Sequence, residues 1–263
     1  MRGFIRTAAL GLLLWPFLAA ASALADCCPA CDPVDGWQQF ERRVKEDAVS
    51  PEQGRAEIAC WAGRLERRYP APGFSGTIHF PVAGYGPKQI GGRQGEAYHA
   101  KSYEFVGERR RRGHPAQDIF VYDGNQDNLD DRTGRPVNIL ALADGVVLST
   151  FCEWTPELSQ LGNGRGGNYV WIYHPALKLF SYYAHLNEVQ VRLGDRVGGG
   201  SVIATLGRTG TRAYAERSPT HLHLMLLRAA DMTPINPYTL LRNLSQPPIG
   251  IRKAAVKTAD TPP

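Results

Sequence analysis

The chain has 263 residues, a formal net charge of +5, 28 glycines and 19 prolines. This length allows one sizeable core, or a domain of about 150 residues with a smaller appendage. The abundance of turn-forming residues and the scarcity of long helical periodicities favour a mainly β fold. The charge is modest and aromatic residues are not interleaved with basic ones, which argues against a nucleic-acid partner.

The N-terminus is typical of a secretory signal. Arginines precede an apolar run over residues 7–18, and small residues follow as far as Ala25. We expect residues 1–25 to be a signal peptide and the protein to be secreted, in the periplasm or outside the cell. No later segment reaches the roughly 18 apolar residues of a membrane span, so we expect none in the mature protein. Lipidation at Cys27 is an alternative, although Asp26 stands where a small residue is usual.

The five cysteines then belong to an oxidising compartment, where we expect disulfides. Three of them cluster at the mature N-terminus, a fourth lies in a helical stretch and the last is distant: Cys27, Cys28, Cys31, Cys60 and Cys152. The odd count leaves one thiol over, and the spacing does not reveal the connectivity. A cysteine-rich metal site is the alternative.

A helical hairpin is predicted over residues 33–69, within a cysteine-containing segment 26–76. Apolar residues recur every three or four positions from Val34 to Ala48, as in an amphipathic helix. Ser50, Pro51 and Gln53 form a typical helix start, and that helix would run to about Arg68. We expect the hairpin to be tied through Cys60, either as a structural cap or as a segment over a functional site.

From Thr77 the pattern changes to short strands separated by turns. We expect strands near residues 78–82, 103–106, 118–122, 139–148, 168–173, 179–184, 189–191, 202–206 and 221–227. Strands this short and this evenly spaced favour an antiparallel β-sandwich or an open half-barrel. We expect this domain to cover residues 77–242. Residues 243–263 are rich in proline, lysine and alanine, so we expect a disordered tail.

Two histidine motifs carry the chemistry. His221 and His223 alternate in an expected strand, so their imidazoles project from one face. His114 and Asp118 are four residues apart across a short turn and can meet at one point. Two imidazoles and a carboxylate suit zinc, and three protein ligands with an open fourth position are typical of a catalytic zinc site. His185 ends an apolar strand, where it could serve as a proton acceptor or oxyanion donor.

The order of the motifs along the chain resembles that of a known protein family. The motifs are His114-x-x-x-Asp118, Gly134-Arg135-Pro136-Val137 leading to Ala143-Asp144-Gly145-Val146-Val147, Gly167-Asn168-Tyr169-Val170, Tyr183-Ala184-His185-Leu186, Gly194-Asp195-Arg196-Val197, Gly207-Arg208-Thr209-Gly210, His221-Leu222-His223 and Asn236-Pro237. In this order they closely resemble the lysostaphin-like zinc endopeptidases, which are peptidoglycan hydrolases, over about residues 78–240.

The resemblance implies one zinc ion bound by His114, Asp118 and His223, with His185 and His221 assisting catalysis. It also implies a secreted metalloendopeptidase that hydrolyses peptide cross-links of bacterial peptidoglycan by metal-activated water. The sequence does not say which imidazole is the base. No accessory wall-binding domain of the kind common beside glycine-bridge cutters is visible, which favours cross-links that contain D-amino acids. A non-catalytic scaffold that activates other wall hydrolases is the alternative.

Some features depart from the family pattern. Ala116 stands where glycine is usual, and Leu224-Met225 replace aromatic and acidic residues. An additional loop contains Asp123, Asn125, Asp127 and Asp131, whose spacing resembles the first half of a calcium-binding loop. It predicts either a calcium site or a polar surface turn, and with calcium the protein could be a wall-binding module.

The basic run 109–112 is either a solvated loop or a segment that attracts an anionic polymer. The oligomeric state cannot be inferred from the sequence.

Overall fold

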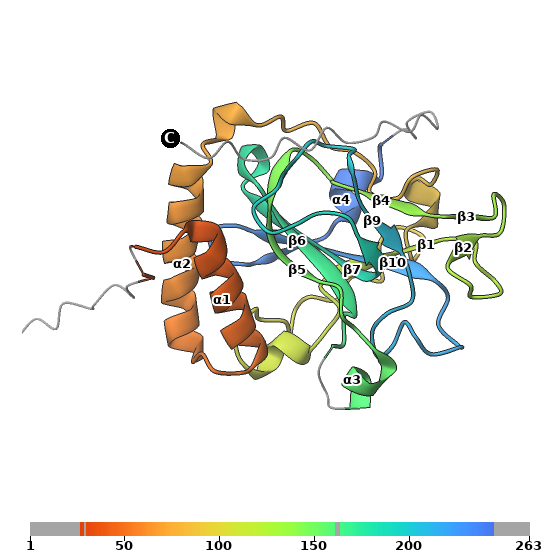
Figure 1. Ribbon diagram of the computed structural model, residues 1–263, viewed down its shortest axis with the longest axis horizontal. Coiled ribbons are helices and arrows are strands. Elements are labelled where there is room, and N and C mark those ends of the chain that lie inside the picture. The colour runs from red at the N-terminus through yellow and green to blue at the C-terminus, as the bar shows by residue number, and fades with distance from the viewer. Residues whose placement is uncertain (1–26, 29, 161–163, 245–263) are drawn as a thin grey trace, which may run out of the picture.

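A computed structural model describes residues 27–28, 30–160 and 164–244 (Figure 1). The expected signal peptide and, from residue 245 on, the expected tail lie outside the described residues. Within the described part of the chain, no helix has the length and apolar character needed to cross a membrane.

The helical hairpin consists of α1, Pro33–Lys45, and α2, Pro51–Arg68. Asp32 caps α1 by accepting a hydrogen bond from the amide of Val34, and Ser50 and Gln53 form the reciprocal capping box of α2, as the sequence predicted. Disulfides join Cys27 to Cys60 and Cys28 to Cys31, while Cys152 is free and exposed. The expected disulfides are therefore present, and a sulfur engaged in a disulfide rules out lipidation of Cys27.

The rest of the fold is a nine-stranded antiparallel sheet in the order β1-β10-β7-β6-β5-β8, with β9 joining β7 to β4 and with β11 beside β10. This confirms the expected mainly β, antiparallel fold. The strands are β1 Ala116–Phe120, β4 Asn138–Leu140, β5 Gly145–Phe151, β6 Asn168–His174, β7 Leu179–Val189, β8 Arg196–Val197, β9 Val202–Leu206, β10 His221–Arg228 and β11 Pro234–Ile235. A separate pair is formed by β2, Leu129–Asp130, and β3, Arg135–Pro136.

Short helices complete the described part of the chain. Two are α-helical, α3 Pro156–Gln160 and α4 Tyr238–Leu241, and four are 3₁₀ turns, Ala71–Gly73, Pro87–Gln89, Glu108–Arg111 and Pro175–Leu177. Three strand predictions were wrong. The segment 189–191 is not a separate strand, because Val189 is the last residue of β7 and the next two residues form no strand. Val82 forms only an isolated bridge with Ile139, and the segment 103–106 forms no strand. Phe105 and Val106 instead bury their side chains in the cluster that contains α1 and α2, so hydrophobic packing replaces strand pairing there.

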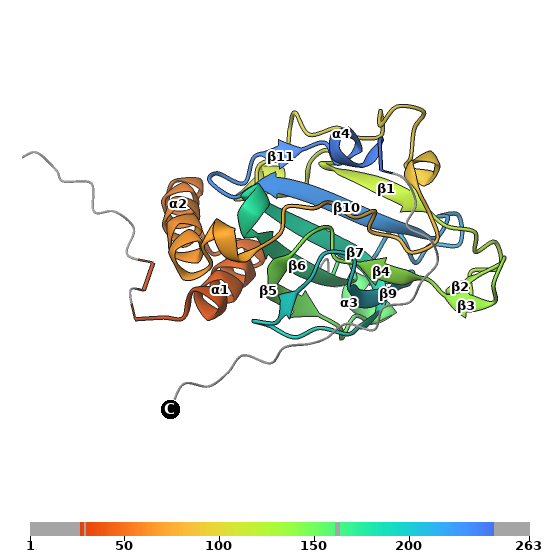
Figure 2. The ribbon, with the colours of Figure 1, turned by 90° about the horizontal axis from the view of Figure 1, so that it is seen from above.

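The hairpin packs on one face of the sheet. Trp37 of α1 is fully buried, and its ring stacks on Phe180 of β7 at a centroid distance of 4.5 Å. Along β10, Met225 and Leu227 belong to this cluster, whereas Leu222, Leu224 and Leu226 belong to the cluster on the opposite face. Figure 2 shows α1 and α2 at the end of the sheet where β10 finishes. Because side chains alternate along a strand, His221 and His223 project from the face that carries the hairpin.

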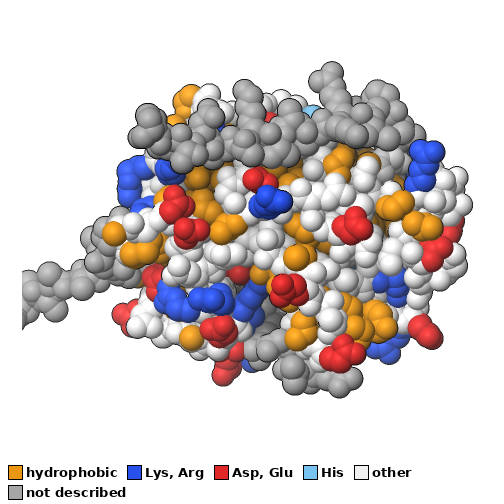
Figure 3. Space-filling model, viewed as in Figure 1, with side chains coloured by type: hydrophobic (Ala, Val, Ile, Leu, Met, Phe, Trp, Pro, Cys, Tyr) orange, Lys and Arg blue, Asp and Glu red, His pale blue; other side chains and the backbone are white. Residues whose placement is uncertain are grey.

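Charged side chains of both signs lie on the face of the molecule seen in Figure 3. In the view of Figure 3, Lys and Arg side chains are interspersed with Asp and Glu. Within the basic run, the guanidinium of Arg110 donates to the carbonyl of Lys45 at 3.0 Å and to the carboxylate of Asp47 at 2.9 Å. Arg110 therefore connects the run to the turn between α1 and α2, and is not free to attract an anionic polymer.

Candidate active site

The pairing of β1 with β10 sets Asp118 directly opposite His223. His114 precedes β1, and its backbone pairs with that of His99 through two hydrogen bonds of 2.8 Å. Gly113 has a φ of +71°, and a Cβ there would lie 2.3 Å from the carbonyl oxygen of His99, so this close approach needs glycine. Local backbone pairing thus presents the imidazole of His114 to the sheet face that carries Asp118 and His223.

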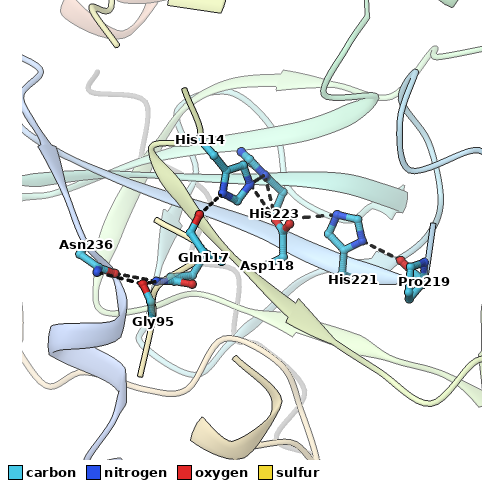
Figure 4. A network of polar contacts seen from close by, with 9 residues as sticks. Gly95, His114, Gln117, Asp118, Pro219, His221, His223 and Asn236 are labelled. Atoms are coloured by element: carbon cyan, nitrogen blue, oxygen red, sulfur yellow. Dashed lines mark hydrogen bonds and ion pairs between the residues drawn. The ribbon is translucent and has the colours of Figure 1, made fainter. Parts of the chain in front are cut away.

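The side chains of His114, Asp118 and His223 converge (Figure 4). The Nε2 atom of His114 lies 3.2 Å from the Oδ1 atom of Asp118 and 3.2 Å from the Nδ1 atom of His223. The last two atoms are 3.1 Å apart. These are the three predicted metal ligands, and among the described residues they are the set of His, Cys, Asp and Glu side chains that could hold a metal ion.

The donor set fits a divalent cation. The Nδ1 atom of His114 lies 2.9 Å from the carbonyl oxygen of Ala97, which can only accept, so this nitrogen carries the proton and Nε2 presents a lone pair. Nε2 therefore faces a carboxylate oxygen and a second imidazole nitrogen, and a cation would satisfy all three. Two imidazole nitrogens and one carboxylate oxygen are ligands that zinc favours.

Electrostatics keep Asp118 ionised. Burial alone would raise the pKa of Asp118, but hydrogen bonds from His114 and His223 and the charges of the imidazoles hold it well below its usual range. Burial lowers the pKa of His223, against the effect of Asp118. The side chains remain accessible, at 30% exposed for His114, 22% for Asp118 and 21% for His223. A ligand can therefore reach them from solvent.

His185 lies in β7 with a φ of +67°, a rare conformation for a residue with a side chain. Its Nδ1 atom lies 2.7 Å from the carbonyl oxygen of Thr209, and its ring centroid is 5.0 Å from that of His221. Burial, followed by the charges of His221 and His223, lowers the pKa of His185 to about 3. Its imidazole is therefore neutral near pH 7, with a lone pair on Nε2.

His221 is held in a similar way. Its Nδ1 atom lies 2.7 Å from the carbonyl oxygen of Pro219, and its Nε2 atom lies 3.8 Å from the Oδ1 atom of Asp118. The carbonyl again fixes the proton on Nδ1 and turns Nε2 toward the ligands, as Figure 4 shows. The five residues singled out in the sequence thus lie together on one face of the sheet.

Of the two alternatives for the acidic loop, the calcium site is not supported and is corrected here to a polar turn. The carboxylate of Asp123 accepts hydrogen bonds from the amides of Asp127 and Asn128 and from the hydroxyl of Thr220. Asp127 accepts from Asn125 and from the amide of Leu129, and Asp131 accepts from the amide of Gly124. The oxygens that would bind calcium instead stabilise the turns of their own loop.

Sequence reasoning missed the groups that orient the site. The carbonyls of Ala97, Thr209 and Pro219 fix three imidazoles. Gln117, next to Asp118, donates to the carbonyl of Gly95 and to Asn236. Several of these groups lie within motifs that the sequence analysis singled out, such as Thr209 in Gly207-Arg208-Thr209-Gly210 and Asn236 in Asn236-Pro237. The motifs alone did not show which contacts these groups make.

Several solved structures match part of this chain. The catalytic domain of lysostaphin from Staphylococcus simulans is 22% identical, over 50% of this chain and 80% of that one, with a TM-score of 0.37. A zinc-containing peptidase from Vibrio cholerae is 21% identical, over 61% of this chain and 39% of that one, with a TM-score of 0.38. A chain of the SpoIIIAH and SpoIIQ complex is 19% identical, over 63% of this chain and 100% of that one, with a TM-score of 0.41.

This chain thus spans less than half the length of the Vibrio cholerae peptidase, and only 43% of the longer lysostaphin structure. No curated protein sequence matches it. The sequence model of peptidase family M23 matches residues 128–237, a segment that contains His185, His221 and His223 and begins after Asp118. Residues 128–237 therefore match peptidase family M23, the lysostaphin-like family that the sequence resembles.

Proposed function

We propose that this protein is a secreted zinc metalloendopeptidase that hydrolyses peptide cross-links of bacterial peptidoglycan. The observation that carries the proposal is the convergence of His114, Asp118 and His223, with two further imidazoles beside them. The match to peptidase family M23 supports the reaction type. The resemblance of the sequence to peptidoglycan hydrolases supports the substrate.

Zinc would be held by Nε2 of His114, Nδ1 of His223 and Oδ1 of Asp118. When bound, the ion supplies Lewis acidity that polarises an amide carbonyl and makes water a stronger acid. The carbonyl of Ala97 keeps the His114 lone pair directed at the ion, as hydrogen bonds to metal-binding histidines commonly do. Asp118 contributes the negative charge of the set.

His185 and His221 would handle the proton. Both carry a proton on Nδ1, donated to a backbone carbonyl, so each presents an unprotonated Nε2. One imidazole can accept the proton of the attacking water, and it then becomes a donor that can protonate the leaving amine. The other helps to position water and the developing oxyanion. The carbonyl tethers keep both rings oriented throughout the reaction.

Hydrolysis of purified, cross-linked peptidoglycan tests the proposal. We expect one zinc per chain and new amine termini, both lost in His223→Ala, and cleavage lost on chelation and restored by zinc. His99→Ala is the matched control, because the His99 side chain is exposed and only its backbone pairs with His114. The masses of the released fragments identify the bond that is cut.

The alternative function is a non-catalytic scaffold that activates other wall hydrolases. A zinc-loaded protein that releases no fragment from several types of wall, while it stimulates a separate hydrolase, would establish the scaffold and reject the enzyme.

A further inference from the structure

Two disulfides meet in the segment that precedes α1. Cys27 is bonded to Cys60 of α2, and the next residue, Cys28, is bonded to Cys31, directly before the residue that caps α1. The two bonds differ in the length of the loop that each closes and in the exposure of their cysteines. They therefore differ in what each contributes to the fold and in how readily an external thiol can reach them.

The bond between Cys27 and Cys60 supports the fold. It spans a sequence separation of 33 residues and joins the segment before α1 to the middle of α2. Cys27 is only 4% exposed, and Cys60 packs against the cluster that also contains Trp37. A shielded bond that closes a long loop restricts the unfolded chain strongly, so we expect it to stabilise the hairpin and to resist reduction.

The bond between Cys28 and Cys31 has the opposite properties. Its sequence separation is 3 residues, so it removes little freedom from the unfolded chain. Cys28 is exposed, whereas Cys31 is half-buried against the hairpin cluster. The φ of Cys28 is +41°, in the left-handed region that costs energy for a residue with a side chain. Opening the bond allows Cys28 to leave this conformation, which favours the dithiol.

Arg64 of α2 keeps the segment in place when this bond opens. Its guanidinium donates to the carbonyls of Cys27, at 2.6 Å, and of Cys28 and Cys31. These contacts involve backbone oxygens and therefore do not depend on the oxidation state of the sulfurs. The bond from Cys27 to Cys60 anchors the same segment covalently. The two thiols of an opened Cys28–Cys31 pair thus stay close together, which favours re-formation of the bond.

We propose that Cys28 and Cys31 form a thiol–disulfide exchange site, which accepts two electrons from the dithiol of a partner protein while the Cys27–Cys60 bond stays closed. One partner thiolate attacks the Sγ atom of the exposed Cys28, which forms a mixed disulfide and releases Cys31 as a thiolate. The second partner thiolate then attacks the partner's sulfur in the mixed disulfide and releases Cys28. The two released thiolates take up the two protons that the partner thiols lost. The partner is oxidised to a disulfide, and the Cys28–Cys31 pair is reduced.

Two cysteines separated by two residues are also the spacing in which disulfide oxidoreductases place their reactive pair. The inference does not depend on the proposed peptidase activity, because none of its observations involves the metal site.

Stepwise reduction of the mature protein tests this inference. The free thiol of Cys152 is first blocked with N-ethylmaleimide, and dithiothreitol then serves as the dithiol. Iodoacetamide traps the thiols that form, and peptide masses identify the labelled cysteines. We expect Cys28 and Cys31 to be labelled at least about tenfold faster than Cys27 and Cys60, with little change in the unfolding temperature or the zinc content.

Two matched double variants separate the roles of the two bonds. Cys28→Ser with Cys31→Ser should remove the fast phase of labelling and keep the unfolding temperature. Cys27→Ser with Cys60→Ser should lower the unfolding temperature and keep the fast phase. Equal rates for the two bonds in the wild-type protein, or reduction of Cys28–Cys31 only in urea that unfolds the protein, would overturn the inference. Label on Cys27 or Cys60 after the first bond has opened would overturn it too, because the two disulfides would then exchange with each other.

Discussion

Backbone carbonyls orient the imidazoles of this site. Ala97 fixes His114, Thr209 fixes His185 and Pro219 fixes His221, each through Nδ1. A carbonyl can only accept, so it selects one tautomer and leaves Nε2 free to bind a metal or a proton. The proposed chemistry therefore depends on loop conformation as much as on the identity of the histidines.

His174 makes stability depend on pH. It is fully buried, with contacts to the carbonyl of Asp144 and the hydroxyl of Ser181, and burial lowers its pKa to about 4. Between its unfolded pKa near 6.5 and this value, the unfolded state binds more protons, so the free energy of unfolding falls as the pH falls. The expected loss between pH 7 and pH 4 is about 3 kcal/mol.

Urea unfolding of the wild type and of His174→Asn across that range measures the effect. Asparagine can keep the donor to Asp144 and cannot titrate, so the variant should lack this part of the pH dependence. If the free energy of unfolding changed with pH by the same amount in both proteins, His174 would not be the source of the pH dependence.

The sequence singled out five residues that the fold brings together, through the spacing of His114 and Asp118, the alternation of His221 and His223, and the resemblance that adds a role for His185. It did not predict the carbonyls, because these lie in loops without periodicity, and their direction depends on φ and ψ values such as those of Gly113 and Gly210. Side-chain identity was readable from the sequence, whereas orientation depended on the fold.

At the scale of elements, the loop of residues 209–219, whose first and last carbonyls hold His185 and His221, depends on Arg208. In Arg208→Met the carbonyls of Ser218 and Ala215 and the hydroxyl of Thr220 lose a charged donor, so we expect a loss of about 3 kcal/mol in the free energy of unfolding. Because the loop also positions His185 and His221, kcat should fall at least about tenfold while KM and zinc content change little.

Arg208→Lys should restore part of kcat, and the exposed Arg217→Met should leave kcat unchanged. Loss of stability with an unaltered kcat at a temperature where the variant is folded would show that Arg208 supports the fold but does not position the imidazoles.

The acidic loop shows why a motif fragment can mislead. The spacing of Asp123, Asn125 and Asp127 fits calcium ligands, but the same short side chains also accept hydrogen bonds from amides two to five residues ahead. The loop lacks the central glycine and the final glutamate of a calcium-binding loop. Its carboxylates instead accept hydrogen bonds within local turns. Asp123 then acquires a different role, because it holds Thr220 directly before His221.

The helical hairpin explains two departures from the family pattern. Ala116 and Met225 are paired across β1 and β10, and both belong to the buried cluster that contains Trp37. Apolar periodicity and capping residues predicted the two helices correctly. Which surface they cover was not predictable, because an amphipathic stripe indicates that a face is buried but not what lies against it.

For the whole molecule, the hairpin and the candidate metal site share one face of the sheet. On β10, Met225 and Leu227 lie under the hairpin cluster, while His221 and His223 occupy the other end of the same face. The metal ligands stay 21–30% exposed, so the described hairpin lies beside the site and does not cover it. This arrangement favours a structural cap over an inhibitory segment.

The shared core predicts that the hairpin and the sheet unfold together. Trp37 is fully buried and stacks on Phe180, and its ring centroid lies 6.1 Å from that of Phe105, so Trp37→Ala should cost about 4 kcal/mol. Calorimetry should show one transition at a lower temperature, with zinc binding by the folded protein unchanged. Gln39→Ala, at an exposed position of α1, is the matched control and should alter stability little. Two transitions, with only the first lowered by Trp37→Ala, would instead mean that the hairpin folds as a separate unit and that the aromatic cluster does not couple it to the face that carries the site.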